Sequence, residues 1–119
     1  MNFKCIQTVW YLVQDRKITA LRIMNKNIQH IDLSYFQELQ ELYLIHCNIS
    51  NLSLSKLPPK LTKLDLSRNE NLTQVDLSGL QELQELDLRE CNIQEIKIPQ
   101  ELRGKIRIIG FDENKIEWV

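Results

Sequence analysis

The chain has 119 residues, of which 43% are hydrophobic and 26% charged, an ordinary composition for one soluble globular domain. Its 15 basic and 16 acidic residues leave a net charge of −1, which disfavours a nucleic-acid partner, since such partners usually require a basic excess. No apolar run reaches the roughly 18 residues of a membrane span and the N-terminus lacks the features of a signal peptide, so we expect neither.

Residues 1–17 precede a series of repeats and are expected to form an N-terminal cap. Stacked repeats expose apolar core and an unpaired strand edge at their first member, so a cover is needed there. The run from Thr8 to Val13 is rich in β-branched and aromatic residues, which leaves an extended conformation open. A helix is nevertheless favoured, because four apolar residues follow the spacing i, i+3, i+4 and i+7: Ile6, Val9, Trp10 and Val13.

From residue 18 onward one phrase returns at a nearly constant interval. It is clearest at Leu61, where LTKLDLSRN fits the pattern LxxLxLxxN. Copies start at residues 18, 39, 61, 83 and 106, with separations of 21, 22, 22 and 23 residues. A fixed period in this range indicates a repeat architecture. We therefore expect a single domain with repeats at 18–38, 39–60, 61–82 and 83–105, followed by a partial repeat and C-terminal cap at 106–119.

Each phrase predicts a strand followed by a buried turn. Leu64 and Leu66 are two residues apart, so in a strand both face one side, while Asp65 faces the other. The turn that follows has backbone groups that need partners, which an inward Asn or Cys can supply. This structural ladder is formed in successive copies by Lys26, Cys47, Asn69, Cys91 and Asn114, where Lys26 departs from the pattern.

A second set of apolar residues follows each turn, as in Leu72, Val75 and Leu77 or the corresponding pair Leu52 and Leu54. Each repeat is thus a flattened coil with two apolar sides, which only stacking can bury. Trp10 and Trp118 are expected to pack on the core as parts of the two caps.

This pattern resembles the leucine-rich repeat family over about residues 18–119, in its short nested form LxxLxLxx(N/C)xLxxLxL. The resemblance implies an α/β-type repeat solenoid that is mostly β: a horseshoe segment with a concave parallel sheet of about five strands. Short extended segments or turns would form the convex side. It also implies that outward residues of the sheet bind a partner.

The concave face is expected to carry two zones. Its central column is predicted to be Arg22, Tyr43, Asp65, Asp87 and Gly110, with Ile108 in the column before it. One zone is apolar and aromatic, and the other alternates in charge. The expected partner-binding residues are Arg22, Met24, Tyr43, Ile45, His46, Lys63, Asp65, Arg68, Asp87 and Arg89.

No constellation for catalysis or cofactor binding is evident, and we expect neither catalytic residues, cofactor nor metal. The sequence has no CxxC, HExxH, GxGxxG or GxxxxGK[ST] motif. His46 and Cys47 are adjacent near a strand and should diverge to opposite faces. Asp65 and Asp87 should be neighbours, but with Lys63, Arg68 and Arg89 nearby a solvated charge mosaic is favoured over acid–base chemistry.

The leading hypothesis is a protein–protein interaction module that regulates or inhibits another protein, including an inhibitor that a pathogen or phage directs against a host factor. A self-associating assembly subunit is the alternative, although a monomer is favoured, and an enzyme is disfavoured. The odd number of widely spaced cysteines (Cys5, Cys47 and Cys91) indicates reduced thiols, and a cytoplasmic location is expected.

Overall fold

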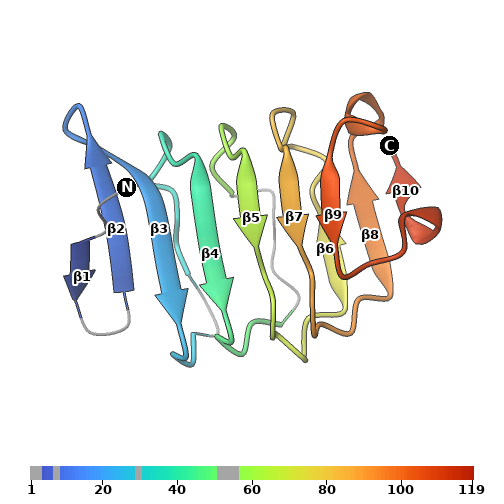
Figure 1. Ribbon diagram of the computed structural model, residues 1–119, viewed down its shortest axis with the longest axis horizontal. Helices are drawn as coiled ribbons and strands as arrows, with labels where there is room; N and C mark the ends of the chain where they lie inside the picture. Colours follow the sequence, from blue (N-terminus) through green and yellow to red (C-terminus); the bar gives the residue numbers. More distant parts are fainter. Residues whose placement is uncertain (1–3, 7–8, 29–30, 51–56) are drawn as a thin grey trace.

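The computed structural model describes residues 4–6, 9–28, 31–50 and 57–119, in which the chain forms two sheets and no α-helix (Figure 1). The larger sheet has the order β1-β2-β3-β4-β5-β7-β9, and the smaller has the order β10-β8-β6. The larger sheet contains β1 (Lys4–Ile6), β2 (Val9–Gln14), β3 (Lys17–Met24), β4 (Glu41–Ile45), β5 (Lys63–Asp65), β7 (Glu85–Asp87) and β9 (Arg107–Ile109). The smaller sheet contains β6 (Gln74–Asp76), β8 (Glu95–Ile98) and β10 (Glu117–Trp118). The described residues also form the short 3-10 helices η2 (Gln100–Leu102) and η3 (Glu113–Lys115).

The repeat period appears directly in the strand register. The five strands from β3 to β9 are parallel, and their central residues pair in the series Leu21, Leu42, Leu64, Leu86 and Ile108. Successive residues in this series are therefore 21, 22, 22 and 22 positions apart in the sequence. On the opposite side Val75 pairs with Ile96 in the same parallel sense. These observations confirm the expected fold class, a mostly β repeat solenoid with a parallel sheet of five strands and short extended segments on the other side.

The core lies between the two sheets. Leu42, Leu64 and Leu86 line it from the larger sheet, and Val75 and Ile96 from the smaller one, each 0–2% exposed. Burial of such a side chain stabilises the fold by about 1.5–3 kcal/mol. Both apolar sides of each coil are thus used, as the two-part phrase predicts. The expected inward pair Leu52 and Leu54 lies outside the described residues.

The N-terminal segment is not helical, and the prediction of a helix there is wrong. β2 pairs antiparallel with β3 from Val9–Ile23 to Gln14–Lys17, with a register shift between Leu12 and Val13. A two-residue turn joins them, in which Asp15 and Arg16 have φ of 50° and 65°. The hairpin pairs with the edge of β3 from Lys17 to Ile23, whereas a helix would leave that edge unpaired.

The last strand is displaced by one residue from the predicted alignment. Asp87 pairs with Ile109 and Leu86 with Ile108, so the outward central residue is Ile109 rather than Gly110. Gly110 has φ of +83°, and a Cβ there would lie 2.7 Å from the Cα of Arg89, so only glycine fits where the chain leaves the sheet.

The C-terminal segment returns to the smaller sheet. β10 pairs in parallel with β8, and the Val119 N–H donates to the Ile98 carbonyl over 2.9 Å. The Arg103 guanidinium lies 5.7 Å from the ring centre of Trp118, close enough for a cation–π contact. Within the described ranges, no helix has the length and apolar character required to cross a membrane.

Candidate functional site

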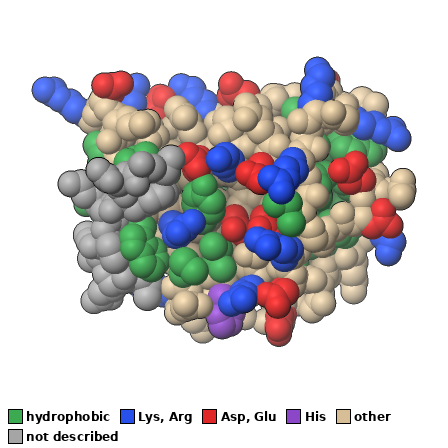
Figure 2. Space-filling model, in the orientation of Figure 1, with side chains coloured by type: hydrophobic (Ala, Val, Ile, Leu, Met, Phe, Trp, Pro, Cys, Tyr) green, Lys and Arg blue, Asp and Glu red, His purple; other side chains and the backbone are tan. Residues whose placement is uncertain are grey.

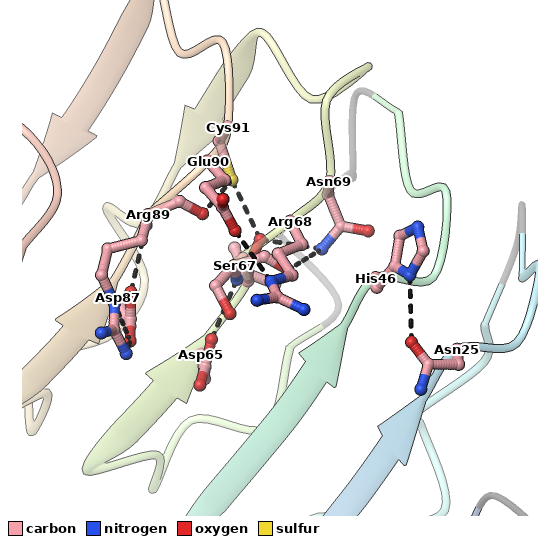
Figure 3. Close-up of polar contacts among 11 residues, drawn as sticks. Asn25, His46, Asp65, Ser67, Arg68, Asn69, Asp87, Arg89, Glu90 and Cys91 are labelled. Carbon is pink, nitrogen blue, oxygen red and sulfur yellow. Dashed lines mark hydrogen bonds and ion pairs between the residues drawn. The ribbon is translucent and has the colours of Figure 1, made fainter.

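Asn69 joins two neighbouring coils at the turn that follows β5 (Figure 3). Its side chain is 0% exposed. The Oδ1 atom accepts hydrogen bonds from the backbone N–H groups of Cys47 (3.0 Å) and Ile49 (3.1 Å). The Nδ2 atom donates to the carbonyls of Leu44 (2.8 Å), Leu66 (2.8 Å) and Ser67 (3.2 Å). One amide therefore satisfies five backbone groups that the turn buries.

The two cysteines lie in the equivalent turns of the coils on either side. The Cys47 thiol donates to the Ile23 carbonyl over 3.4 Å, and the Cys91 thiol donates to the Leu66 carbonyl over 3.0 Å. Burial raises the pKa of both thiols above the ordinary value, which keeps them protonated donors. Asn114 does not belong to this ladder. It is exposed within η3, and its backbone N–H donates to the Asp112 side chain, because the last coil is displaced by one residue and ends in the 3-10 turn.

A left-handed residue follows the strand in each of four coils and directs a side chain to the rim of the sheet. Asn25, His46, Arg68 and Glu90 have φ between 54° and 60°. His46 Nδ1 lies 3.0 Å from Asn25 Oδ1, and Arg68 Nε donates to Glu90 Oε2 over 2.7 Å (Figure 3). These contacts place His46 and Arg68, two expected binding residues, in two polar pairs along the carboxyl ends of the strands.

The open face of the larger sheet is the side that points away from the core, expected from the sequence to be concave. Its central column follows from the register: Trp10 pairs with Arg22, Arg22 with Tyr43, Tyr43 with Asp65, Asp65 with Asp87, and Asp87 with Ile109. Trp10 is thus on the open face, whereas Val9 and Tyr11 pack on the core. The expectation that Trp10 packs on the core, as part of a helix within residues 1–17, is therefore wrong.

The N-terminal half of the open face carries an apolar patch, formed by Trp10, Met24, Tyr43 and Ile45, all partly exposed. The Arg22 guanidinium lies 4.9 Å from the centre of the Tyr43 ring. The Tyr43 hydroxyl donates to Glu41 Oε1. Partial burial and the neighbouring Glu41 carboxylate raise the pKa of Tyr43 well above its ordinary value, so the hydroxyl is a neutral donor.

The C-terminal half carries charged side chains that pair with one another. Arg89 Nε lies 3.1 Å from both carboxylate oxygens of Asp87, and Arg89 Nη2 lies 2.6 Å from Asp87 Oδ2. Burial alone would raise the pKa of Asp87, but these bonds, the Arg89 backbone N–H and the guanidinium charge outweigh it, so the pKa lies below its ordinary value. Arg107 forms a similar pair with Glu85 at 3.2 Å, while Lys63 is exposed.

Two adjoining hollows connect the apolar patch with the charged half. The larger, of about 720 Å³, is lined by Met24, Ile45, Asp65, Ser67, Arg68, Arg89, Glu90 and Gly110. The smaller, of about 170 Å³, is lined by Tyr43, Lys63, Leu64, Asp65, Glu85, Asp87, Arg89 and Ile109. Figure 2 shows hydrophobic side chains gathered on one half of this face and acidic and basic side chains interleaved on the other. All ten expected binding residues lie on this face or along its rim.

The groups that could carry chemistry are separated or already engaged among the described residues. His46 is exposed and Cys47 is fully buried, so the adjacent pair does not converge on a common point. The Asp87 carboxylate is occupied by Arg89. In the part of the chain that the structure describes, no three His, Cys, Asp or Glu side chains are grouped closely enough to hold a metal ion.

Comparisons with known proteins agree with the coil geometry. Two leucine-rich repeat models match adjacent segments, one at residues 58–80 and one at residues 82–104. Searches of the curated proteins and of the solved structures gave no match. The matched segments coincide with two consecutive coils of the stack, those that begin with β5 and β7. The repeated register, the Asn69 turn and these matches together identify the chain as a leucine-rich repeat protein.

Proposed function

We propose that this protein binds a partner protein through the open face of its larger sheet and thereby regulates or inhibits that partner. Leucine-rich repeat domains generally mediate protein–protein interactions and are typically not enzymes. The finer proposal rests on one observation, the contrast between the two sheets. Among the described strand residues of the smaller sheet, the exposed ones are all polar or charged, and the partly exposed Trp118 packs against the core; the exposed ones are Gln74, Asp76, Glu95, Lys97 and Glu117.

The open face, by contrast, leaves aromatic and aliphatic side chains partly exposed next to charged ones. Tyr, Trp and Arg are enriched among residues that dominate interface energetics. Trp10, Arg22 and Tyr43 lie side by side in the central column, so an occupant would meet all three. Removal of this apolar area from water would supply affinity, while the interleaved charges of the C-terminal half would orient the partner and set the association rate.

The test is affinity capture from a lysate of the native cell, followed by mass spectrometry. An open-face variant, Tyr43→Ser with Ile45→Ser, is compared with wild type and with a matched back-sheet variant, Gln74→Ser with Lys97→Ser. Circular dichroism first establishes that all three forms are folded. A protein retained by wild type and by the back-sheet variant, but lost from the open-face variant, is the expected result. Equal retention by both variants would contradict the proposal.

Self-association through the same face is distinguished by light scattering. A monomer has a mass of 14.1 kDa. We expect that mass for wild type at working concentrations. A dimer that persists in the back-sheet variant and disappears in the open-face variant would instead assign the face to a second copy of the chain.

A further inference from the structure

We propose that the partner offers the open face an extended segment with a large apolar side chain and, two residues away, a Lys or Arg side chain. The basic group would pair with Asp65, and the apolar group would pack on Tyr43 and Ile45. This inference rests on the proposed function and specifies the chemistry of the partner. It follows from Asp65, a carboxylate of this face that has no side-chain partner among the described residues.

Four other carboxylates of the open face and its rim each have a side-chain partner. These pairs are Glu41 with the Tyr43 hydroxyl, Glu85 with Arg107, Asp87 with Arg89, and Glu90 with Arg68. Asp65 is different. Its Oδ1 accepts the backbone N–H of Ser67 at 2.9 Å, and among the described residues it forms no ion pair (Figure 3).

None of the neighbouring Lys and Arg side chains of the described residues forms an ion pair with Asp65. Arg89 lines both hollows together with Asp65, but its guanidinium is held by two oxygens of Asp87. Arg22 lies over the Tyr43 ring in the preceding coil. Within the described structure Lys63, two residues before Asp65 on β5, is exposed and also forms no ion pair. The floor shared by the two hollows therefore contains a carboxylate, Asp65, that no cation of the described residues contacts directly.

An occupant that covers this floor must bring a cation. To remove an ionised carboxylate from water without a partner costs several kcal/mol, and a charged donor at hydrogen-bond distance offsets that cost. An acidic side chain at the same place would meet the Asp65 carboxylate, and like-charge contact in an interface is unfavourable. Charge complementarity thus selects a basic group at this position.

The register sets the spacing of the two groups. Tyr43 pairs with Asp65 on the adjacent strand, so their Cα atoms are about 4.8 Å apart. Ile45 lies two residues further along β4, so it is diagonal to Asp65 at about 7–8 Å. In an extended segment, side chains two residues apart point to one side and are about 6.6–6.8 Å apart. An apolar and a basic residue at that spacing can therefore reach both places at once.

The experiment is a selection of a random 12-residue peptide library, displayed on phage, against three forms of the full chain. These are wild type, Asp65→Asn and Asp76→Asn, and each selected peptide is then tested for binding to the open-face variant, Tyr43→Ser with Ile45→Ser. An Asn at 65 keeps an oxygen for the Ser67 N–H and so preserves the turn. Asp76 makes the same turn with the Ser78 N–H at 3.0 Å, but on the smaller sheet, which makes it the matched control.

Wild type and Asp76→Asn are expected to enrich peptides with Lys or Arg two positions from an aliphatic or aromatic residue. Asp65→Asn is expected to lose the basic preference and to bind a selected peptide at least about tenfold more weakly. Two results would overturn the inference and leave the proposed function intact. In the first, the selected peptides require Tyr43 and Ile45 but show no preference for Lys or Arg. In the second, they require both residues and show the same basic preference when selected on Asp65→Asn. Absence of any peptide that requires Tyr43 and Ile45 would count against both.

Discussion

Asn69 illustrates how single side chains hold adjacent coils in register. An isolated coil cannot satisfy the backbone of its own turn, because the turn is buried against the next coil. The Asn69 amide accepts from the coil before it and donates to carbonyls in both. Cys47 and Cys91 donate in the equivalent turns but have no oxygen with which to accept. The Asn69 turn should therefore be the most costly of the three to disrupt.

We expect Asn69→Ala to lower the free energy of unfolding by on the order of 3 kcal/mol, because each buried group left unpaired costs about 1–3 kcal/mol. Urea denaturation followed by circular dichroism measures the change. Asn71→Ala is the control, since that amide is exposed and donates to the exposed Asn48 side chain over 2.8 Å. Its effect should stay within about 0.5 kcal/mol. If the two variants had equal effects, the Asn69 network would not be a main source of stability.

The ion pair of Asp87 and Arg89 gives a second prediction, about pH. The pKa of Asp87 is lower in the folded chain than its ordinary value, so the unfolded state binds more protons in that range. Stability from this pair is therefore present above the ordinary carboxyl pKa of about 3.9 and is lost as pH falls through the folded value. Arg89→Gln should thus lower the urea midpoint at pH 7 and have a smaller effect at pH 2.5.

Lys97→Gln serves as the control, since Lys97 is exposed on the smaller sheet and forms no ion pair within the described structure. It should have little effect at either pH. If Arg89→Gln reduced the midpoint equally at both pH values, the loss would come from packing of the arginine stem rather than from the charge pair.

At the scale of elements, the hairpin of β2 and β3 performs two tasks with alternate residues. Tyr11 pairs with Leu21 and faces the core, whereas Trp10 pairs with Arg22 and faces outward. Adjacent residues on a strand point to opposite faces, so two neighbouring aromatic side chains have different roles. The cap is therefore also part of the open face.

We expect Tyr11→Ala to cost about 2 kcal/mol of stability, less than the 3–5 kcal/mol of a fully buried aromatic side chain because Tyr11 is only partly buried. Trp10→Ala should cost less stability but weaken capture of the partner. Denaturation midpoints and the capture assay measure the two effects separately. A larger loss of stability for Trp10→Ala than for Tyr11→Ala would show that the hairpin register is inverted.

The same elements show what the sequence could and could not predict. The coils were predictable because every one must present the same inward leucines. The hairpin was not predictable, because its turn places Asp15 and Arg16 in the left-handed conformation. Hairpin turns of this kind are usually recognised in a sequence by Asn or Gly at those positions. In the last coil Ile106, Ile108 and Ile109 are apolar in close succession, so hydrophobicity alone left the phase ambiguous by one residue.

The candidate site was predictable only in part, for a similar reason. Alternation along each strand assigns outward positions such as Tyr43 and Asp65 without any structure. Which charged side chains pair with one another depends on the directions those side chains take. The alternation of inward and outward residues does not determine these directions. That Arg89 is engaged by Asp87, and that Asp65 has no such partner among the described residues, is evident only from the structure.

At the scale of the whole molecule, the coils form a row in which each strand contacts mainly its neighbours in the stack (Figure 1). The molecule measures 38 × 28 × 23 Å, and its core is a single row of buried side chains that runs along the stack from Leu21 to Ile116. Stability in such a stack is approximately a sum of coil and interface contributions. Local opening at one end should therefore be independent of changes at the other.

A pair of reciprocal substitutions tests this independence. Leu21 in β3 and Leu102 in η2 are 6% and 7% exposed and lie toward opposite ends of the row. Leu21→Ala should increase hydrogen exchange of amides in β2 and β3 and leave β8 and β10 close to wild type. Leu102→Ala should do the reverse. Exchange measured by mass spectrometry under native conditions gives both profiles, and a uniform loss of protection from either variant would mean that the row opens as one unit. Independent ends would allow the hairpin to adjust to a partner on the open face while the coils that carry Asp65 and Asp87 keep their register.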